Sequence, residues 1–369
     1  MGVWEYGRIG VSITPSLHFS NTPLGSHSMK IGILGFAHGH VGMYISRWRD
    51  QPEMGIRVVA GWDHDAARAE ANCANFGIER AESVEKLLSA DIDAVVIAAE
   101  TSMHADLVEQ AAEAGKAIVL QKPIALTMAQ ADRIVNAVNQ SGVPFTLAWQ
   151  MRVDPHNLQA KALLESREFS KVFQVRRRHC LATQHMRDFE NMWHVKPELN
   201  RDIFADDAAH AIDFIYWLLG KPSSVFCELG TLLNPKVPND NAIAVFRYPD
   251  GKFAEVSCSF VAVAGENTLE ILCENGLIVG NYGDGPSNSV RPPDAPQLKW
   301  YLQGKGWTIS DLPEIRGQGE RIANLAQPIA DFLLGKRPPI AAAEEGRDVL
   351  RMVLACYESD SHGKRIQVE

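Results

Sequence analysis

The feature of this sequence that most limits its fold is a regular alternation of short apolar runs and helix-like segments between residues 31 and 148. Apolar runs of this length, bounded by glycine or an acidic residue, are typical of strands buried on both faces of a parallel sheet. Parallel neighbours need a crossover connection, which is usually a helix. The alternation therefore predicts a parallel sheet with helices on both faces. The predicted strands are 31–35, 56–63, 94–99, 117–120 and 144–148, and the predicted helices are 39–49, 66–76, 83–88, 101–114 and 127–139.

From residue 171 the pattern changes to alternation with a period of two, interrupted by turn sequences such as Tyr248–Gly251. This pattern predicts a mostly antiparallel sheet, with a helix around 207–219 packed nearby. The expected fold is α/β plus α+β: a Rossmann-type domain over 29–148, then a substrate-binding and oligomerisation domain over 149–369. Residues 1–28 are set apart as an N-terminal extension, either a real arm or an over-extended start. The predicted strands are 172–180, 224–232, 242–248, 253–260, 268–273 and 277–280.

Charge and composition exclude several classes of protein. The formal net charge of -9 argues against non-specific binding to nucleic acid, which depends on positive charge. No stretch approaches the ~18 apolar residues that a membrane span needs. The six cysteines have no C-x-x-C spacing, which indicates free thiols in a reducing compartment. We therefore expect a cytoplasmic protein with no nucleic-acid or membrane partner.

The loop after the first predicted strand resembles a dinucleotide-binding turn. The fingerprint G-x-G-x-x-G needs small residues where backbone N–H groups approach a pyrophosphate at a helix N-terminus. Gly35 fits the first position, Ala37 replaces the second glycine, and His40 replaces the third. A metal site on His38 and His40 is disfavoured, because a phosphate loop is expected there and no carboxylate is near in sequence. The residues expected at the cofactor are Gly35, Phe36, Ala37, His38 and Gly39.

Asp63 ends the second predicted strand, where a carboxylate can accept hydrogen bonds from the adenosine ribose. A 2′-phosphate would be repelled there, which favours NAD, and the neighbouring His64 leaves NADP open. The alternative is that Asp63 caps the helix beginning at Ala66, since aspartate is a common N-cap.

A second group of polar residues falls on a helix. Asp206, His210 and Asp213 have i, i+4 and i+7 spacing, which places them on one helix face. A carboxylate one turn from an imidazole can orient the ring and stabilise its charged form. The structural alternative is that Asp206 is an N-cap and His210 a buried core histidine.

Gln121-Lys122-Pro123 follows the fourth predicted strand, and the run Ala98–His104 follows the third. Together with Gly35–His40, Asp63 and the segment Ile203–Gly220, they resemble the Gfo/Idh/MocA oxidoreductase family. The resemblance implies an NAD(P)-dependent enzyme of sugars or cyclitols that forms dimers or tetramers. It places Lys122 near the nicotinamide and the reacting carbon, with Ala99, Glu100, His104 and Gln121 along the cofactor.

Gln121 departs from the family's usual glutamate. A neutral amide would either let the pKa of the neighbouring lysine fall or preserve the hydrogen bonds of the glutamate. Arg152 follows the last strand of the first domain, where the family often has a basic residue near the cleft. It is expected either to contact substrate or to begin a surface helix.

The predicted mechanism has His210 as general base, Lys122 stabilising the reacting oxygen, and Asp206 orienting His210 or holding a neighbouring hydroxyl. No metal is required. Two alternatives remain open at this point. One is net glycoside hydrolysis or elimination with transiently used NAD, and the other is a catalytically silent binding protein.

Overall fold

The computed structural model describes residues 28–263, 267–282, 296–315 and 317–368, so the extension 1–28 lies outside the described residues except for Ser28. The first domain is a six-stranded sheet in the order β3-β2-β1-β4-β5-β6, with all paired neighbours parallel. This order is that of a dinucleotide-binding doubly wound fold. The strands are β1 (Met29–Leu34), β2 (Ile56–Trp62), β3 (Glu79–Arg80), β4 (Ala94–Ile97), β5 (Ala117–Leu120) and β6 (Phe145–Leu147).

Helices separate these strands as the alternation predicted. They are α1 (His40–Asp50), α2 (Ala66–Phe76), α3 (Val84–Leu88), α4 (His104–Glu113) and α5 (Met128–Ser141). Local chemistry sets several ends. The side chains of Asp65 and Thr127 accept backbone hydrogen bonds at the starts of α2 and α5, and left-handed Gly77 and Gly142 end them. The two-residue strand β3 was not predicted, because two exposed residues carry no apolar pattern.

The second domain contains a nine-stranded sheet in the order β14-β13-β12-β11-β7-β10-β9-β8-β15. Only the pair β7 and β10 is parallel, which confirms the prediction of a mostly antiparallel sheet. The strands are β7 (Val172–Cys180), β8 (Ser224–Gly230), β9 (Asn241–Arg247), β10 (Phe253–Ser259), β11 (Asn267–Cys273), β12 (Gly276–Tyr282), β13 (Leu298–Leu302), β14 (Gly306–Ile309) and β15 (Ile366–Gln367). The last three were not predicted.

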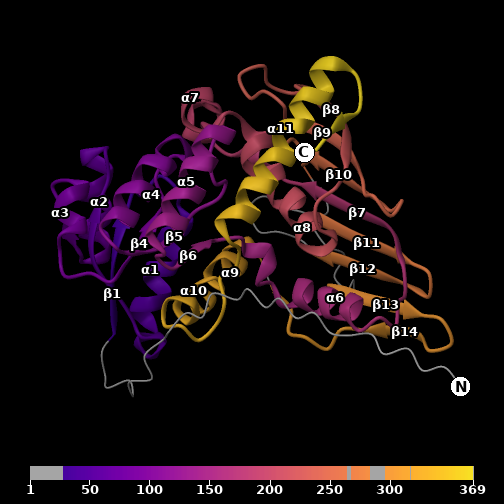
Figure 1. Ribbon diagram of the computed structural model, residues 1–369, viewed down its shortest axis with the longest axis horizontal. Helices are drawn as coiled ribbons and strands as arrows, with labels where there is room; N and C mark the ends of the chain where they lie inside the picture. Colours follow the sequence, from indigo (N-terminus) through magenta and orange to yellow (C-terminus); the bar gives the residue numbers. More distant parts are fainter. Residues whose placement is uncertain (1–27, 264–266, 283–295, 316, 369) are drawn as a thin grey trace, which may run out of the picture.

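Helices lie between the two sheets, and the longest of them, α11, runs through the middle of the molecule (Figure 1). It packs against α5 of the first domain and against β8 and α8 of the second. The helices of this part are α6 (Pro155–Glu165), α7 (Pro197–Asn200), α8 (Ala209–Leu219), α9 (Gln318–Ala323), α10 (Ala326–Leu333) and α11 (Ala343–His362).

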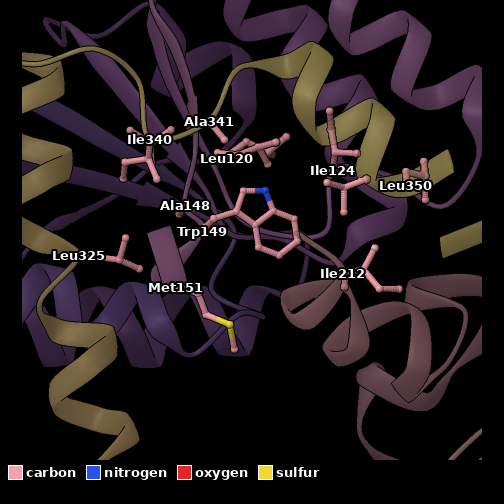
Figure 2. Packing of buried hydrophobic residues seen from close by; sticks show 14 of the residues in the cluster. Leu120, Ile124, Ala148, Trp149, Met151, Ile212, Leu325, Ile340, Ala341 and Leu350 are labelled. Carbon is pink, nitrogen blue, oxygen red and sulfur yellow. The ribbon is translucent and has the colours of Figure 1, made fainter. Parts of the chain in front are cut away.

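The junction between the domains is apolar and centred on Trp149, which is 1% exposed. Figure 2 shows its indole between Leu120 and Ile124 of the first domain, Ile212 of α8, and residues of the C-terminal segment. The backbone N–H of Leu147 donates to the carbonyl of Ala341 at 3.0 Å, so the C-terminal segment continues the edge of the first sheet. The end of the first sheet is thus held rigidly against the second domain.

Two sequence-based expectations concern the molecule as a whole. Within the described ranges, no helix combines the length and apolar character needed to span a bilayer. All six cysteines lie in described parts of the chain, and all are buried free thiols, as predicted.

Candidate active site

The dinucleotide loop begins at Gly35, directly after β1. Its φ is +87°, and a Cβ added there would lie 2.4 Å from Cα of Ala99. A side chain at this position would both strain the backbone and collide with the end of β4. The turn is fixed by two hydrogen bonds, from the Gly35 N–H to the Trp62 carbonyl (2.7 Å) and from the His38 N–H to the Ala98 carbonyl (2.9 Å). Gly35 therefore has the role that the fingerprint requires.

The loop leads into the N-terminus of α1, where no side chain accepts from the helix. Gly39 stands at the N-cap with no heavy atom within 4 Å of where its Cβ would be. His38 is buried, and neither of its ring nitrogens has a hydrogen-bond partner in the described structure. Burial lowers the pKa of His38, and burial together with the charge of Lys122 lowers that of His40 to about 3. The start of α1 thus has no capping side chain and lies beside two neutral imidazoles.

His38 and His40, for which a metal site was disfavoured, have neighbouring rings. The rings of His38 and His40 meet edge to face with centroids 4.3 Å apart. Within the part of the chain that the structure describes, no group of three or more histidine, cysteine or acidic side chains could hold a metal ion.

Asp63 is buried at the end of β2, and its two oxygens are already hydrogen-bonded. Oδ2 accepts from the Phe36 N–H at 2.7 Å and from Arg68 Nε at 2.7 Å. Oδ1 accepts from a terminal nitrogen of Arg68 at 2.8 Å and from the Asp65 N–H at 2.9 Å. The interpretation of Asp63 as the cap of α2 is wrong, because Asp65 is the N-cap.

Arg68, a residue that the sequence analysis did not select, joins two carboxylates at this position. Besides Asp63 it contacts Glu100, whose Oε1 accepts at 2.8 Å. His64 is partly exposed beside the group, 3.4 Å from Asp63 and 3.5 Å from Glu100. The predicted ribose site therefore contains a guanidinium between two buried acids.

His104 was predicted to line the cofactor, but the structure shows it supporting the loop that carries Lys122. Its Nδ1 lies 3.0 Å from the Pro123 carbonyl, and its Nε2 lies 3.2 Å from the Ala99 carbonyl. Burial lowers its pKa to about 4, against the effect of these carbonyls. Because both ring nitrogens face backbone carbonyls, this imidazole is a structural link between the ends of β4 and β5.

Lys122 is buried at the carboxyl end of β5, before a cis bond to Pro123. Its Nζ donates to Oδ1 of Asp206 at 2.9 Å and to the Asp206 carbonyl at 3.2 Å. Asp207 lies further away, at 3.9 Å. Although burial raises the pKa of Asp206, the charges of Lys122 and His194 hold it well below its usual range.

Gln121 does not contact this ion pair. Its side chain is fully buried, and its amide nitrogen donates to the hydroxyl of Tyr44 at 3.0 Å. Asp206, from the second domain, is the carboxylate that pairs with Lys122.

The predicted pairing of Asp206 with His210 is wrong. Residues Phe204–Ala208 form a π-helical turn before α8, which widens the spacing and rotates Asp206 away from the face of His210. Oδ2 of Asp206 instead pairs with Nδ1 of His194 at 2.7 Å. The carboxylate nearest to His210 is Asp207, whose Oδ1 lies 3.8 Å from Nε2.

His210 is buried beside two other rings, Trp149 at a centroid distance of 5.4 Å and His179 at 6.2 Å. Its Nδ1 has no partner in the described structure. Burial, then the charge of Lys122, lowers its pKa well below the usual value, so the ring is neutral near pH 7. A neutral imidazole with an open nitrogen can accept a proton.

Arg152 neither contacts the cleft nor begins a surface helix. It is buried, and its guanidinium binds Asp213 through Nε (3.0 Å) and a terminal nitrogen (2.7 Å), and Glu345 of α11 at 2.7 Å. Asp213, predicted on the same face as Asp206, is therefore the partner of this arginine. These charges fasten α8 and α11 to the end of the first domain.

Sequence reasoning also missed three aromatic residues near the site, Trp149, Trp193 and His194, and the buried His179 of β7. Trp193 and His194 lie in a short 3-10 turn, which has no periodicity to mark it. His179 lies in a strand with the usual alternation, and nothing in the sequence pattern indicates that its side chain is buried at the site.

Comparison with known proteins gives a consistent result for both halves of the chain. Residues 29–148 match the family described as "Oxidoreductase family, NAD-binding Rossmann fold", and residues 157–279 match the "GFO/IDH/MocA C-terminal domain". The scyllo-inositol 2-dehydrogenase (NAD(+)) of Bacillus subtilis is 24% identical over 93% of this chain and 97% of its own length. D-apiose dehydrogenase of Paraburkholderia graminis is 26% identical over 92% of this chain and 88% of its own.

Solved structures share the fold over nearly the full length. An oxidoreductase from Agrobacterium radiobacter, solved with NAD+, L-tartaric acid and magnesium, superposes with a TM-score of 0.78. It is 22% identical, and the match covers 92% of this chain and 98% of that one. A levoglucosan dehydrogenase in complex with NADH and L-sorbose gives a TM-score of 0.78 at 20% identity, covering 93% and 99%.

Proposed function

Because this chain belongs to the GFO/IDH/MocA family of NAD-binding oxidoreductases, we propose that it oxidises one secondary alcohol of a sugar or cyclitol at the site formed by Lys122 and His210. The observation that carries this proposal is the buried ion pair of Lys122 with Asp206 beside a neutral His210. These groups come from both domains and meet beyond the carboxyl ends of parallel strands, where ligands of such sheets bind.

The loop residues fit a dinucleotide. Gly35 gives the close turn, Gly39 leaves space, and the start of α1 offers backbone N–H groups without a capping side chain. These features suit a pyrophosphate. We assign Asp63 to the adenosine ribose, with Arg68 and His64 adjusting the charge there. When bound, the nicotinamide supplies the hydride acceptor.

The protein side chains handle the proton and the charge on oxygen. The neutral His210 accepts the proton of the reacting hydroxyl. In this proposal the ammonium of Lys122 stabilises the negative charge that develops on that oxygen. Asp206 acts through Lys122 by fixing the ammonium from the other side. This replaces the predicted role of Asp206 as the residue that orients His210.

We also propose a homo-oligomer formed through the second sheet. On the strands, buried residues alternate with residues that point away from α8 and α11. The latter include exposed apolar side chains that a second copy would cover: Ile243, Leu272, Tyr301, Trp307 and Ile309. Tyr301, Trp307 and Ile309 lie on the paired strands β13 and β14, and exposed apolar side chains that gather in this way mark interfaces. Six free buried thiols support a reducing, cytoplasmic setting.

The deciding experiment is calorimetric titration of cofactor-free protein with NAD and NADP, followed by a panel of sugars and cyclitols monitored at the absorbance of NADH. We expect NAD binding and NADH formation with one class of polyol. Binding without NADH accumulation would redirect the assignment to non-redox glycoside chemistry, and no binding would leave a protein that does not use the cofactor.

A further inference from the structure

We propose that Trp193–His194 is a positioning segment: His194 sets the orientation of Lys122 through Asp206, and Trp193 fastens the same segment to the dinucleotide loop. The inference rests on the proposed function, which gives Lys122 its role at the reacting oxygen.

The first observation is the division of the Asp206 carboxylate between two partners. Oδ1 accepts from Lys122 at 2.9 Å, and Oδ2 pairs with His194 Nδ1 at 2.7 Å. A buried carboxylate needs a partner on each oxygen to offset its lost hydration. His194 therefore determines which oxygen faces Lys122. Without it, Oδ2 would be buried without a donor, and the carboxylate would be free to rotate.

The second observation is that Trp193 spans from this pair to the cofactor loop. Its indole N–H donates to the Ala37 carbonyl at 3.1 Å, and its ring stacks on His194 with centroids 4.0 Å apart. Two adjacent residues of the second domain thus hold the backbone of the predicted pyrophosphate loop and the carboxylate of Asp206 together. A displacement of about 1 Å between such groups is enough to lower a rate by about 100-fold.

The third observation is access to solvent. The side chain of His194 is 26% exposed, whereas those of Lys122 and Asp206 are 4% and 3% exposed. The charged or titratable groups that face His194 are Asp206, the ring of His38 at 6.2 Å, and, beyond them, Lys122 and His40. His194 is accordingly the member of this cluster that bulk water reaches most directly.

The test uses two substitutions of His194 in the full chain, with kcat and KM measured separately. His194→Asn keeps a donor near the position of Nδ1 and should retain kcat within about threefold. His194→Ala should lower kcat by about 10- to 100-fold. His185→Asn, which changes an exposed histidine earlier in the chain, is the matched control and should behave as wild type. Equal losses in both His194 variants would overturn the proposal.

Trp193→Phe separates the two halves of the segment. It keeps the ring on His194 but removes the N–H that Ala37 accepts. We expect a higher KM for NAD with little change in kcat. An unchanged KM would remove the loop from the proposal.

A readout without catalysis distinguishes this proposal from the proposed function. In 15N-histidine NMR spectra, Lys122→Met should move the Nδ1 resonance of His194, because both groups share Asp206. If wild type forms no NADH and this resonance still moves, the proposed function fails and the coupling stands. If NADH forms and the resonance does not move, only the positioning role fails.

Discussion

Arg68 binds the carboxylate of Asp63 through two hydrogen bonds, with nitrogen–oxygen distances of 2.7 and 2.8 Å, at the place where an adenosine ribose is expected. A guanidinium there reduces the repulsion that two buried acids would exert on a 2′-phosphate. We expect Arg68→Ala to weaken NADP binding by about tenfold, equivalent to ~1.4 kcal/mol, and to weaken NAD binding less. Calorimetry with both cofactors measures this. Arg80→Ala, which breaks an exposed pair with Glu70, is the control. Equal loss for both cofactors would show that Arg68 serves the fold alone.

Removal of either proposed catalytic side chain should reduce turnover with little loss of cofactor affinity. For Lys122→Ala and His210→Ala we expect kcat to fall by about 100- to 1,000-fold, since each removes a group that acts on the reacting oxygen. Stopped-flow or steady-state rates give kcat, and calorimetry gives the Kd for NAD. Weakened NAD binding with normal turnover at saturation would contradict these roles.

Arg152 offers a test of stability rather than of binding. Its replacement by alanine leaves Asp213, which is fully buried, without its main counter-charge. We expect the free energy of unfolding to fall by about 3–5 kcal/mol. Urea unfolding followed by circular dichroism measures the change. Arg133→Ala, which removes an exposed pair with Asp106 and Glu109, should cost less than about 1 kcal/mol. A raised KM for substrate without loss of stability would instead support the prediction that Arg152 contacts substrate.

Buried histidines should make the fold sensitive to acid. Burial lowers the pKa of His104 from 6.5 to about 4. Between these values the unfolded chain binds the proton and the folded chain does not, so stability is lost as the pH falls from 6.5 toward 4. The shift corresponds to about 3 kcal/mol. Unfolding in urea at pH 7, 6, 5 and 4 should show a declining midpoint, with a shallower decline in His104→Gln. An equal slope in that variant would assign the effect to other groups.

The uncovered sheet face predicts a specific loss of assembly. Trp307 and Ile309 are 55% and 62% exposed on β14. We expect Ile309→Lys to shift the protein toward monomer, because a charge would be buried without a partner in the interface. Sedimentation velocity measures the change, with Leu158→Lys, on an exposed position of α6, as the control. A wild-type monomer at micromolar concentration would refute the proposed oligomer.

The elements of the fold were predictable where the pattern was local. Strands such as β5 and β7, and helices such as α2, matched their predicted ranges, because apolar period and cap residues are set within a few residues. The short strands β3 and β15 carry too few residues for a period and depend on pairing with distant strands.

The site was predicted in its components but not in its pairings. Lys122, Asp206 and His210 were selected, yet the partner of each depends on contacts between residues far apart in sequence. Lys122 and Asp206 are 84 positions apart. The assumption of a regular helix gave Asp206 the wrong partner, because a π-helical turn changes which residues share a face. No sequence pattern near His194 identifies it as the second partner of the Asp206 carboxylate.

The packing of the C-terminal segment on β6 has a consequence for synthesis on the ribosome. The first domain has its strands by residue 147, yet Gly346 packs so closely on Leu147 that a Cβ there would lie 2.2 Å from its side chain. Until residues 340–362 emerge, one flank of the nucleotide-binding half remains an open apolar edge. Domains usually fold in order as they leave the ribosome. In this protein the first domain can complete its packing only after α11 has been synthesised. A nascent chain that ends within α11 would therefore be a target for chaperones and proteases rather than a truncated enzyme.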